Sequence, residues 1–196
     1  MKPAPALITP ALGLFLPLAL VSSLLLAGCS ESSAPAATPT PSARPALSGA
    51  TATDTGWIQL LIPMDDQAGQ LLELAADRAS APRLATWAVE CAEDHGSELA
   101  RLRVLLLRMG LPDTNVHRGH DMPGMVTEAD LARGRRLTGA AFDRFVLQEL
   151  RDHLGQSRRV SRSAARSAGS DEVRRLAARI ADTRTGQLRA LPRVQD

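Results

Sequence analysis

The stretch that decides the fold is residues 82–110, PRLATWAVECAEDHGSELARLRVLLLRMG. Apolar side chains recur in it every three or four residues, at Leu84, Trp87, Ala88, Cys91, Leu99, Leu102, Leu105 and Leu106. This spacing places them on one face of an α-helix, whereas a half-buried strand would alternate every second residue. Pro82 suits a first helical turn, and Gly110 suits a helix end. The stretch therefore predicts one long amphipathic helix with a buried stripe.

Three more long segments have the same period, one before this helix in the sequence and two after it. The first begins near Asp54 or Thr55, either of which can cap it. Another begins near Ala140, and the last begins at Asp171, whose carboxylate suits an N-cap. A loop and a short helix opened by Thr127 separate the two pairs. Short turns inside each pair predict an all-α, antiparallel four-helix bundle over residues 54–196.

The two halves of this region resemble each other at a shift of 89 positions. Without any gap, the shift superposes Gln59 on Gln148, Gln67 on Gln156, Ala88 on Ala177, Leu99 on Leu188 and Leu102 on Leu191. We therefore predict a duplicated helical hairpin. The same shift pairs the inward-facing positions of one half with those of the other.

The first 28 residues have the layout of an export signal. Lys2 and the amino terminus precede an apolar run, and small residues lead to Cys29. This ending resembles the lipobox of bacterial lipoproteins, in which the cysteine is acylated and becomes the new amino terminus. We expect an extracytoplasmic protein held to the cell membrane by lipid on Cys29. The alternative is an uncleaved membrane anchor, which Pro10 and Pro17 within the run disfavour.

Residues 29–53 are rich in Pro, Ser, Thr and Ala and carry almost no core-forming side chains. This composition predicts a disordered tether between the lipid and the helical domain. Beyond the signal, 22 arginines face 21 acidic residues, so there is no basic excess that would favour nucleic acid as a partner. A basic face, formed by Arg158, Arg159, Arg162 and Arg166, predicts either a solvated surface or contact with anionic lipid headgroups.

Polar and sulfur-bearing side chains fall on or beside the inward-facing stripes, namely Met64, Asp65, His95, Glu98, His153, Arg184 and Gln187. Buried ionisable groups need partners, because an isolated one costs several kcal/mol. The layer is therefore either an internal ion-pair network or a ligand site. A guanidinium keeps its proton and repels cations, so Arg184 favours the network. Helical bundles also build metal sites from facing side chains, so a metal site is the alternative.

A second group of metal-binding side chains lies in the central loop, at His117, His120, Met122 and Met125. Imidazole and thioether ligands together suit copper, especially Cu(I). The alternative is that the methionines pack the loop onto the bundle while the histidines face solvent. Sequence patterns typical of catalytic nucleophiles and phosphate-binding loops are absent, so we expect no enzyme.

Several of these motifs resemble the bacterial "domain of unknown function 305" proteins, which are ferritin-like four-helix bundles and usually exported. The family's Met-Ile-Pro-His-His corresponds to 61–65, and its Met-Pro-Gly-Met matches 122–125. Its Gly-Ala-x-Phe-Asp, which a second His-His pair follows, matches 139–143, and that pair corresponds to His153-Leu154. Its Gln-x-x-Glu-Ile corresponds to 95–99. The resemblance covers residues 55–191 and implies the fold.

The resemblance also implies a metal, because some members of the family are associated with copper binding and with copper or silver tolerance. This chain departs from the family at the metal-binding positions: the first His-His pair is Met64-Asp65, the second keeps only His153, and Arg184 replaces a glutamine. Two hypotheses follow. The leading one is a non-enzymatic tethered protein that binds copper or another soft metal through its His/Met loop. The other is a structural or interaction module that has lost metal binding; the sequence identifies no protein partner and leaves homodimerisation open.

Overall fold

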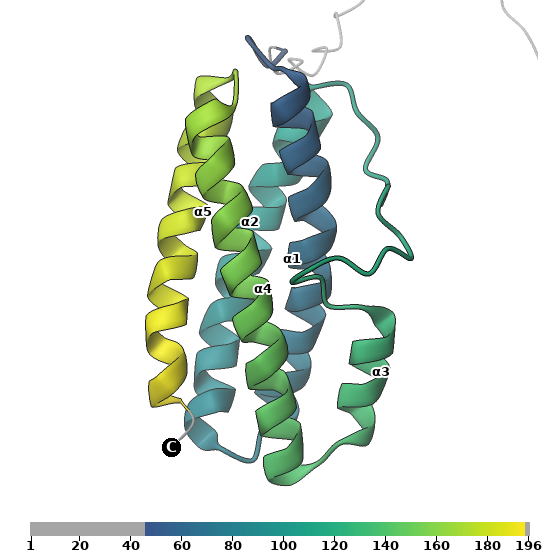
Figure 1. The fold of residues 1–196 in the computed structure, drawn as a ribbon, viewed down its shortest axis with the longest axis vertical. Coiled ribbons are helices and arrows are strands. Elements are labelled where there is room, and N and C mark those ends of the chain that lie inside the picture. The colour runs from purple at the N-terminus through teal and green to yellow at the C-terminus, as the bar shows by residue number, and fades with distance from the viewer. Residues whose placement is uncertain (1–45, 195–196) are drawn as a thin grey trace, which may run out of the picture. The chain divides into compact units, whose positions relative to one another are not determined.

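The computed structural model describes residues 46–194. In this range all secondary structure is helical (Figure 1), in the order α1 (Ala52–Arg78), α2 (Pro82–Arg108), α3 (Glu128–Arg136), α4 (Gly139–Ser167), α5 (Asp171–Ala190) and the 3-10 helix η1 (Leu191–Arg193). The predicted export signal, Cys29 and most of the predicted tether lie outside the described residues. None of the helices within 46–194 has both the length and the apolarity needed to cross a membrane.

The four long helices form two antiparallel hairpins, α1 with α2 and α4 with α5. The hairpins join through α1 against α4 and, more weakly, through α2 against α5, so α1 and α5 lie diagonally opposite, as do α2 and α4. Figure 1 shows the connection from α2 to α4 running from one end of the bundle to the other, with α3 beside α1 and α4. This confirms the predicted antiparallel four-helix bundle, with one long crossover of the kind found in ferritin-like folds.

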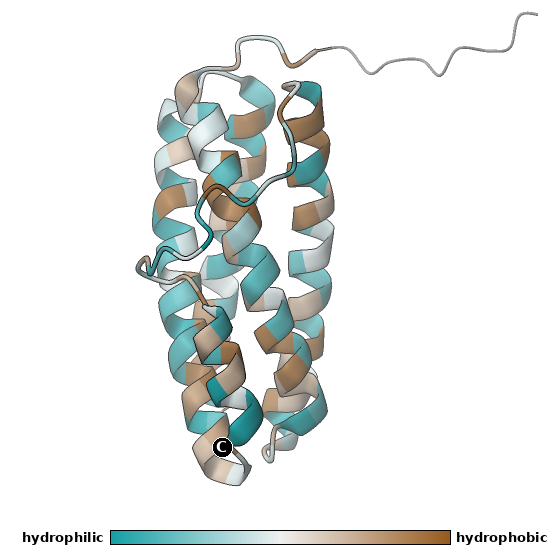
Figure 2. Ribbon diagram, turned by 90° about the vertical axis from the view of Figure 1, so that its right-hand side faces the viewer, coloured by the Kyte–Doolittle hydropathy of each residue, from teal (hydrophilic) through white to brown (hydrophobic). Residues whose placement is uncertain are grey.

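The interior contains two apolar clusters, one toward each end of the bundle. The first includes Leu71, Leu84, Phe142, Val146 and Leu150. The second includes Ile58, Leu102, Val173 and Ile180. Figure 2 shows hydrophobic and hydrophilic residues interspersed along the helices, as expected where each helix has one buried face. Burial of each large apolar side chain stabilises the fold by about 1.5–3 kcal/mol. The two clusters together form the hydrophobic core of the described residues.

Two helix starts differ from the sequence-based expectation. α1 begins at Ala52, because Thr51 is its N-cap and Asp54 is the third helical residue of a reciprocal capping box. α5 has Ser170 as its N-cap, and Asp171 is its first helical residue. In both cases an aspartate that was expected to cap a helix lies inside the first turn, where its negative charge is favourable.

Two buried aspartates tie each hairpin to the turn of the other hairpin. Asp54 of α1 accepts hydrogen bonds from the backbone N–H groups of residues 169 and 170, at 2.8 and 3.0 Å. Asp143 of α4 accepts from the backbone N–H groups of residues 80 and 81, at 2.9 and 3.0 Å. These contacts are equivalent under the shift of 89 positions. Burial alone would raise the pKa of Asp54, but hydrogen bonds from Thr51 and from the α4–α5 turn hold this pKa below its usual value.

We expect Asp143→Ala to lower the free energy of unfolding by roughly 2–4 kcal/mol, because hydrogen bonds to a charged acceptor contribute about 1.5–3 kcal/mol and two turn N–H groups would lose theirs. Urea denaturation measures the loss. Asp182 is an exposed residue of α5, and Asp182→Ala is the matched control, with an expected change within about 0.5 kcal/mol. Equal losses in the two variants would contradict a stabilising contact between Asp143 and the α1–α2 turn.

Candidate metal centre in the bundle core

A polar layer separates the two apolar clusters, and each long helix contributes to it. Asp65 comes from α1, His95 and Glu98 from α2, His153 and Ser157 from α4, and Arg184 and Gln187 from α5. Asp65, His95, His153 and Arg184 are all fully buried. The apolar clusters on both sides exclude water from the layer, so every charge and hydrogen bond within it counts more than it would at the surface.

Two histidines face each other across one diagonal of the bundle. The Nε2 atoms of His95 and His153 are 3.1 Å apart. The Nδ1 atom of His95 lies 2.8 Å from the carbonyl oxygen of Cys91, and that of His153 lies 3.3 Å from the carbonyl oxygen of Gly124. A carbonyl only accepts hydrogen bonds, so both Nδ1 atoms are assigned as N–H donors.

The two imidazoles make three contacts: one between their Nε2 atoms and one from each Nδ1 atom to a carbonyl oxygen. Three hydrogen bonds would need three protons, and two neutral rings have only two. Two neutral imidazoles carry two protons, and the carbonyls take both, so the Nε2 atoms direct lone pairs at each other. Burial, followed by the nearby Arg184 guanidinium, lowers the pKa of His153 to about 3. Burial, Arg184 and His153 together hold the pKa of His95 well below its usual range. At neutral pH both rings are therefore neutral, and the two lone pairs are available to a metal ion.

Asp65 completes a set of three ligands. Its Oδ1 atom is 3.5 Å from His153 Nε2, and one ligand atom each from Asp65, His95 and His153 lie within 4.8 Å of one another. The other oxygen, Oδ2, is buried and has no hydrogen-bond donor among the described residues. A tetrahedral ion with bonds of about 2.0–2.1 Å separates its ligands by about 3.3 Å. The His95 Nε2–His153 Nε2 separation of 3.1 Å and the His153 Nε2–Asp65 Oδ1 separation of 3.5 Å are each within a few tenths of an ångström of that spacing.

Arg184 holds the carboxylates in place. Its guanidinium donates to Asp65 Oδ1 at 3.0 Å, to Gln187 Oε1 at 3.3 Å and, through Nε, to Ser157 Oγ at 3.1 Å. It also lies 2.7 Å from Glu98 Oε2 in an ion pair that lacks the direction of a hydrogen bond. The predicted ion-pair network is therefore present in the structure.

The charges of the layer leave room for a cation. Asp65 and Glu98 carry two negative charges when both are ionised, and Arg184 carries one positive charge, so the layer has at most one excess negative charge. Burial raises the pKa of Asp65, against the opposing effect of Arg184, and it raises the pKa of Glu98 to about 7. Arg184 therefore does not make the layer positive, contrary to our reason for disfavouring a metal there.

A family described as "Domain of unknown function (DUF305)" matches residues 54–195. The chain belongs to this family. The fold is similar to a crystal structure of a DUF305 fragment from Deinococcus radiodurans, with a TM-score of 0.66 and 21% identity over 74% of this chain and 97% of that one. It is also similar to a DUF305 protein from Streptomyces coelicolor described as secreted, with a TM-score of 0.63 and 19% identity over 71% and 89% of the two chains. No curated protein matches the chain.

The loop residues of this DUF305 domain are only partly gathered. The rings of His117 and His120 meet edge to face with centroids 6.2 Å apart. Both line a surface recess of about 660 Å³ together with Met125, whereas Met122 does not line it. Outside the core, no group of three His, Cys or carboxylate ligand atoms meets within the described residues. The loop therefore forms a looser site than the core.

The loop has a second role that sequence reasoning missed, which is to support His153. Gly124 has a φ of +75°, and a Cβ atom there would lie 2.8 Å from the Asp152 carbonyl oxygen and would overlap Gln156. Only glycine permits this approach to α4, and the approach brings the Gly124 carbonyl to His153 Nδ1. Backbone carbonyls commonly orient metal-binding histidines in this way. The glycine of the Met-Pro-Gly-Met motif was the available signal.

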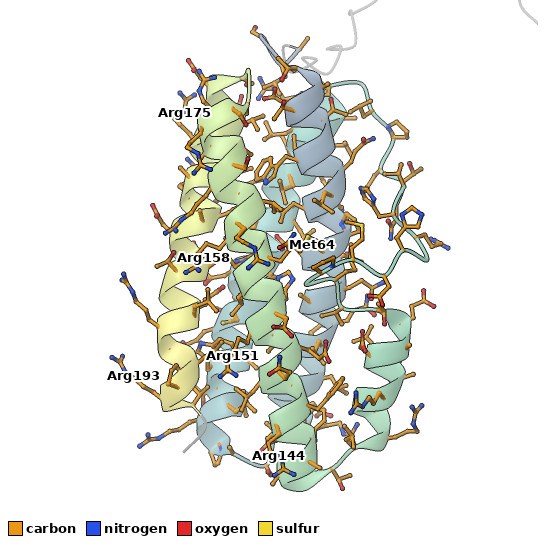
Figure 3. All side chains as sticks on the ribbon, in the orientation of Figure 1. Met64, Arg144, Arg151, Arg158, Arg175 and Arg193 are labelled. Carbon is orange, nitrogen blue, oxygen red and sulfur yellow. The ribbon has the colours of Figure 1, made fainter. Side chains whose placement is uncertain are left out.

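Two further residues complete the description of the layer. Met64 is buried, belongs to neither apolar cluster, and lies in the middle of the bundle in Figure 3. Cys91 is a free, buried thiol whose pKa is raised to about 12, first by burial and then by the Asp94 carboxylate. Cys91 therefore acts as a small apolar residue whose carbonyl, not its sulfur, supports the site.

We expect the buried His153 to make the metal-free domain less stable in acid. Its pKa is about 3 in the folded protein and about 6.5 when unfolded, so below pH 6.5 the unfolded chain binds the extra proton. The unfolding free energy of the wild type minus that of His153→Phe should fall by about 1.4 kcal/mol per pH unit from pH 6 to pH 4. Urea denaturation at several pH values tests this, and a difference independent of pH would contradict it.

Proposed function

We propose that this DUF305 domain binds one transition-metal ion, copper foremost, between Asp65, His95 and His153. The observation that carries the proposal is the 3.1 Å approach of two histidine Nε2 atoms whose Nδ1 atoms both face backbone carbonyls. A metal ion between them would satisfy both lone pairs. The Asp65 carboxylate, whose Oδ1 lies 3.5 Å from His153 Nε2 and whose Oδ2 has no hydrogen-bond donor among the described residues, would supply a further ligand atom and a negative charge.

Three features favour copper over other ions. Imidazole binds copper, zinc, iron and nickel, whereas a thioether selects Cu(I). Met64, which is buried and precedes Asp65 in α1, is the candidate fourth ligand. A monovalent ion such as Cu(I) suits a layer whose excess negative charge is at most one. The association of some family members with copper agrees with this choice.

The proposed role is to hold the metal, without catalysis. The three ligands are fully buried between two apolar clusters, so a bound ion would have no contact with solvent in this conformation. A catalytic metal keeps an open coordination position for water or substrate. The site therefore suits retention of a metal in homeostasis or stress. The recess lined by His117 and His120 remains a second candidate site, in which fewer ligand atoms lie close together.

The proposed location is the outer side of the cytoplasmic membrane, with the domain attached through lipid on Cys29. The support is the apolar run and small residues that precede Cys29. The Streptomyces coelicolor relative described as secreted agrees with an extracytoplasmic location.

We expect the domain to take up one equivalent of Cu(I), measured anaerobically against a competing chromophoric chelator. His95→Phe and His153→Phe should each abolish tight binding, because Phe fills the space of the ring and offers no lone pair. Gly124→Ala should weaken binding roughly 10–100-fold, which is the usual effect of losing a partner that orients a ligand histidine.

The matched control for this titration replaces all four loop residues, His117, His120, Met122 and Met125, by Ala. Its affinity should equal that of the wild type. Loss of binding in this control, with retention in His153→Phe, would move the site to the loop and contradict the core proposal.

A second candidate function rests on the ion pairs of Arg184 with Asp65 and Glu98. On this alternative the layer only fixes the packing of the four helices, and the domain is a structural or interaction module without a metal. It predicts the same thermal unfolding midpoint with and without copper. A large upward shift with copper would exclude it, because a ligand that binds only the folded state raises stability.

For the anchor, we expect Cys29→Ser to abolish incorporation of labelled palmitate in a bacterial host and to release the protein from the membrane fraction. Cys91→Ser is the matched control, because it removes the only other cysteine and should leave labelling unchanged. Equal labelling of the two variants would contradict lipidation at Cys29.

A further inference from the structure

The outward side of the second hairpin carries a row of arginines, with one exposed aspartate, Asp182, among those of α5, and we name it the arginine face. It consists of Arg144, Arg151, Arg158, Arg159, Arg162 and Arg166 on α4, Arg175, Arg179 and Arg189 on α5, and Arg193 in η1. Most spacings along each helix are three, four or seven residues, and the two others, Arg158 to Arg159 and Arg179 to Arg189, also keep the side chains on the outward side. Figure 3 shows Arg144, Arg151 and Arg158 one above another along α4, with Arg175 and Arg193 toward opposite ends of α5.

The arginine face is not neutralised by the protein. Nine of its ten arginines are exposed, and Arg158 is partly buried. Within the described residues, none of the ten forms an ion pair with a carboxylate. Arg158 Nε has no hydrogen-bond partner there either. A row of unpaired guanidinium groups repels itself, so an anionic surface that binds it would relieve this repulsion.

The charge of the domain is divided between its hairpins. Helices α4 and α5 contain 11 arginines and six acidic residues, an excess of five positive charges. Helices α1 and α2 contain five arginines and nine acidic residues, an excess of four negative charges. The near-neutral whole chain therefore conceals a strongly basic side. Such asymmetry between halves indicates a charged partner for one of them.

The chain enters the domain beside one end of the arginine face. The segment before α1 approaches the α4–α5 turn, because Asp54 accepts hydrogen bonds from Gly169 and Ser170. Arg162 and Arg166 precede this turn, and Arg175 follows it. The 22 residues between Cys29 and Ala52 reach at most about 75 Å, and a helix of the length of α4 is about 44 Å long. That reach lets the whole of α4 lie against the membrane.

We infer that the arginine face docks the domain onto a bilayer surface containing anionic phospholipids. Guanidinium groups bind phosphate oxygens in pairs, which suits them to lipid headgroups. The inference is independent of the proposed metal site and does not require the lipid anchor, although a lipid on Cys29 would hold the face near the bilayer. A second copy of the chain is a poorer occupant, because three of the nine acidic residues of its α1–α2 hairpin, Asp54, Asp65 and Glu98, are buried.

The test is co-sedimentation of the chain from Ser30 onward with lipid vesicles. This chain lacks the export signal and the lipid-accepting cysteine and keeps the complete core. We expect it to bind vesicles containing phosphatidylglycerol, to ignore vesicles of phosphatidylcholine alone, and to dissociate at high salt. Arg144→Gln, Arg151→Gln and Arg162→Gln combined should lower the partition coefficient roughly a hundredfold, because each basic residue near the surface contributes about fivefold.

The matched control replaces Arg83, Arg135 and Arg136 by Gln, which removes the same charge from exposed positions on α2 and α3. This variant should bind like the wild type, and circular dichroism should show both triple variants to be folded. Absence of binding to phosphatidylglycerol vesicles would overturn the inference. An equal loss in both triple variants would also overturn it, because net charge rather than the arginine face would then explain the binding. Self-association that disappears only in the α4 variant, with no vesicle binding, would assign the face to a second copy instead.

Discussion

The buried guanidinium of Arg184 is the constraint on which the rest of the core depends. It keeps its positive charge in an environment without water, so the bundle must supply anions and acceptors around it. Asp65 reaches it from α1, Glu98 from α2 and Ser157 from α4, and Gln187 lies one turn along its own helix. The contacts join all four helices at one level. They fix the helices relative to one another more sharply than the apolar clusters could, because apolar contacts tolerate sliding.

The same network prepares the metal site. Arg184 holds one oxygen of Asp65 and leaves the other unpartnered, while its charge and the surrounding burial keep both histidines neutral. Neutral imidazole is the form that binds metals. The Cys91 and Gly124 carbonyls then orient the two rings toward a common point. The ion-pair network and the metal site, which the sequence presented as alternatives, are therefore compatible neighbours in one layer.

Helical period and the duplication predicted the bundle and identified the members of the polar layer other than Ser157, because inward-facing positions follow from spacing alone. Spacing did not reveal which members touch. His95 and His153 meet across a diagonal between α2 and α4, and such a contact depends on the relative height of helices from different hairpins. The hydrogen bonds from Asp54 and Asp143 to the turn of the other hairpin were missed for a similar reason. In the sequence, an aspartate near a helix start resembles an ordinary cap, and only the structure shows which turn lies beside it. The loop was singled out by its His and Met content, whereas its closest link to the core is the backbone of Gly124.

The measurement that tests the central claim most directly is an anomalous difference map from crystals of the copper-loaded protein. We predict one strong peak between the Nε2 atoms of His95 and His153, within bonding distance of the Asp65 carboxylate. A map whose only peak lies at His117 and His120, or a map without a peak from protein shown to contain stoichiometric copper in solution, would contradict it.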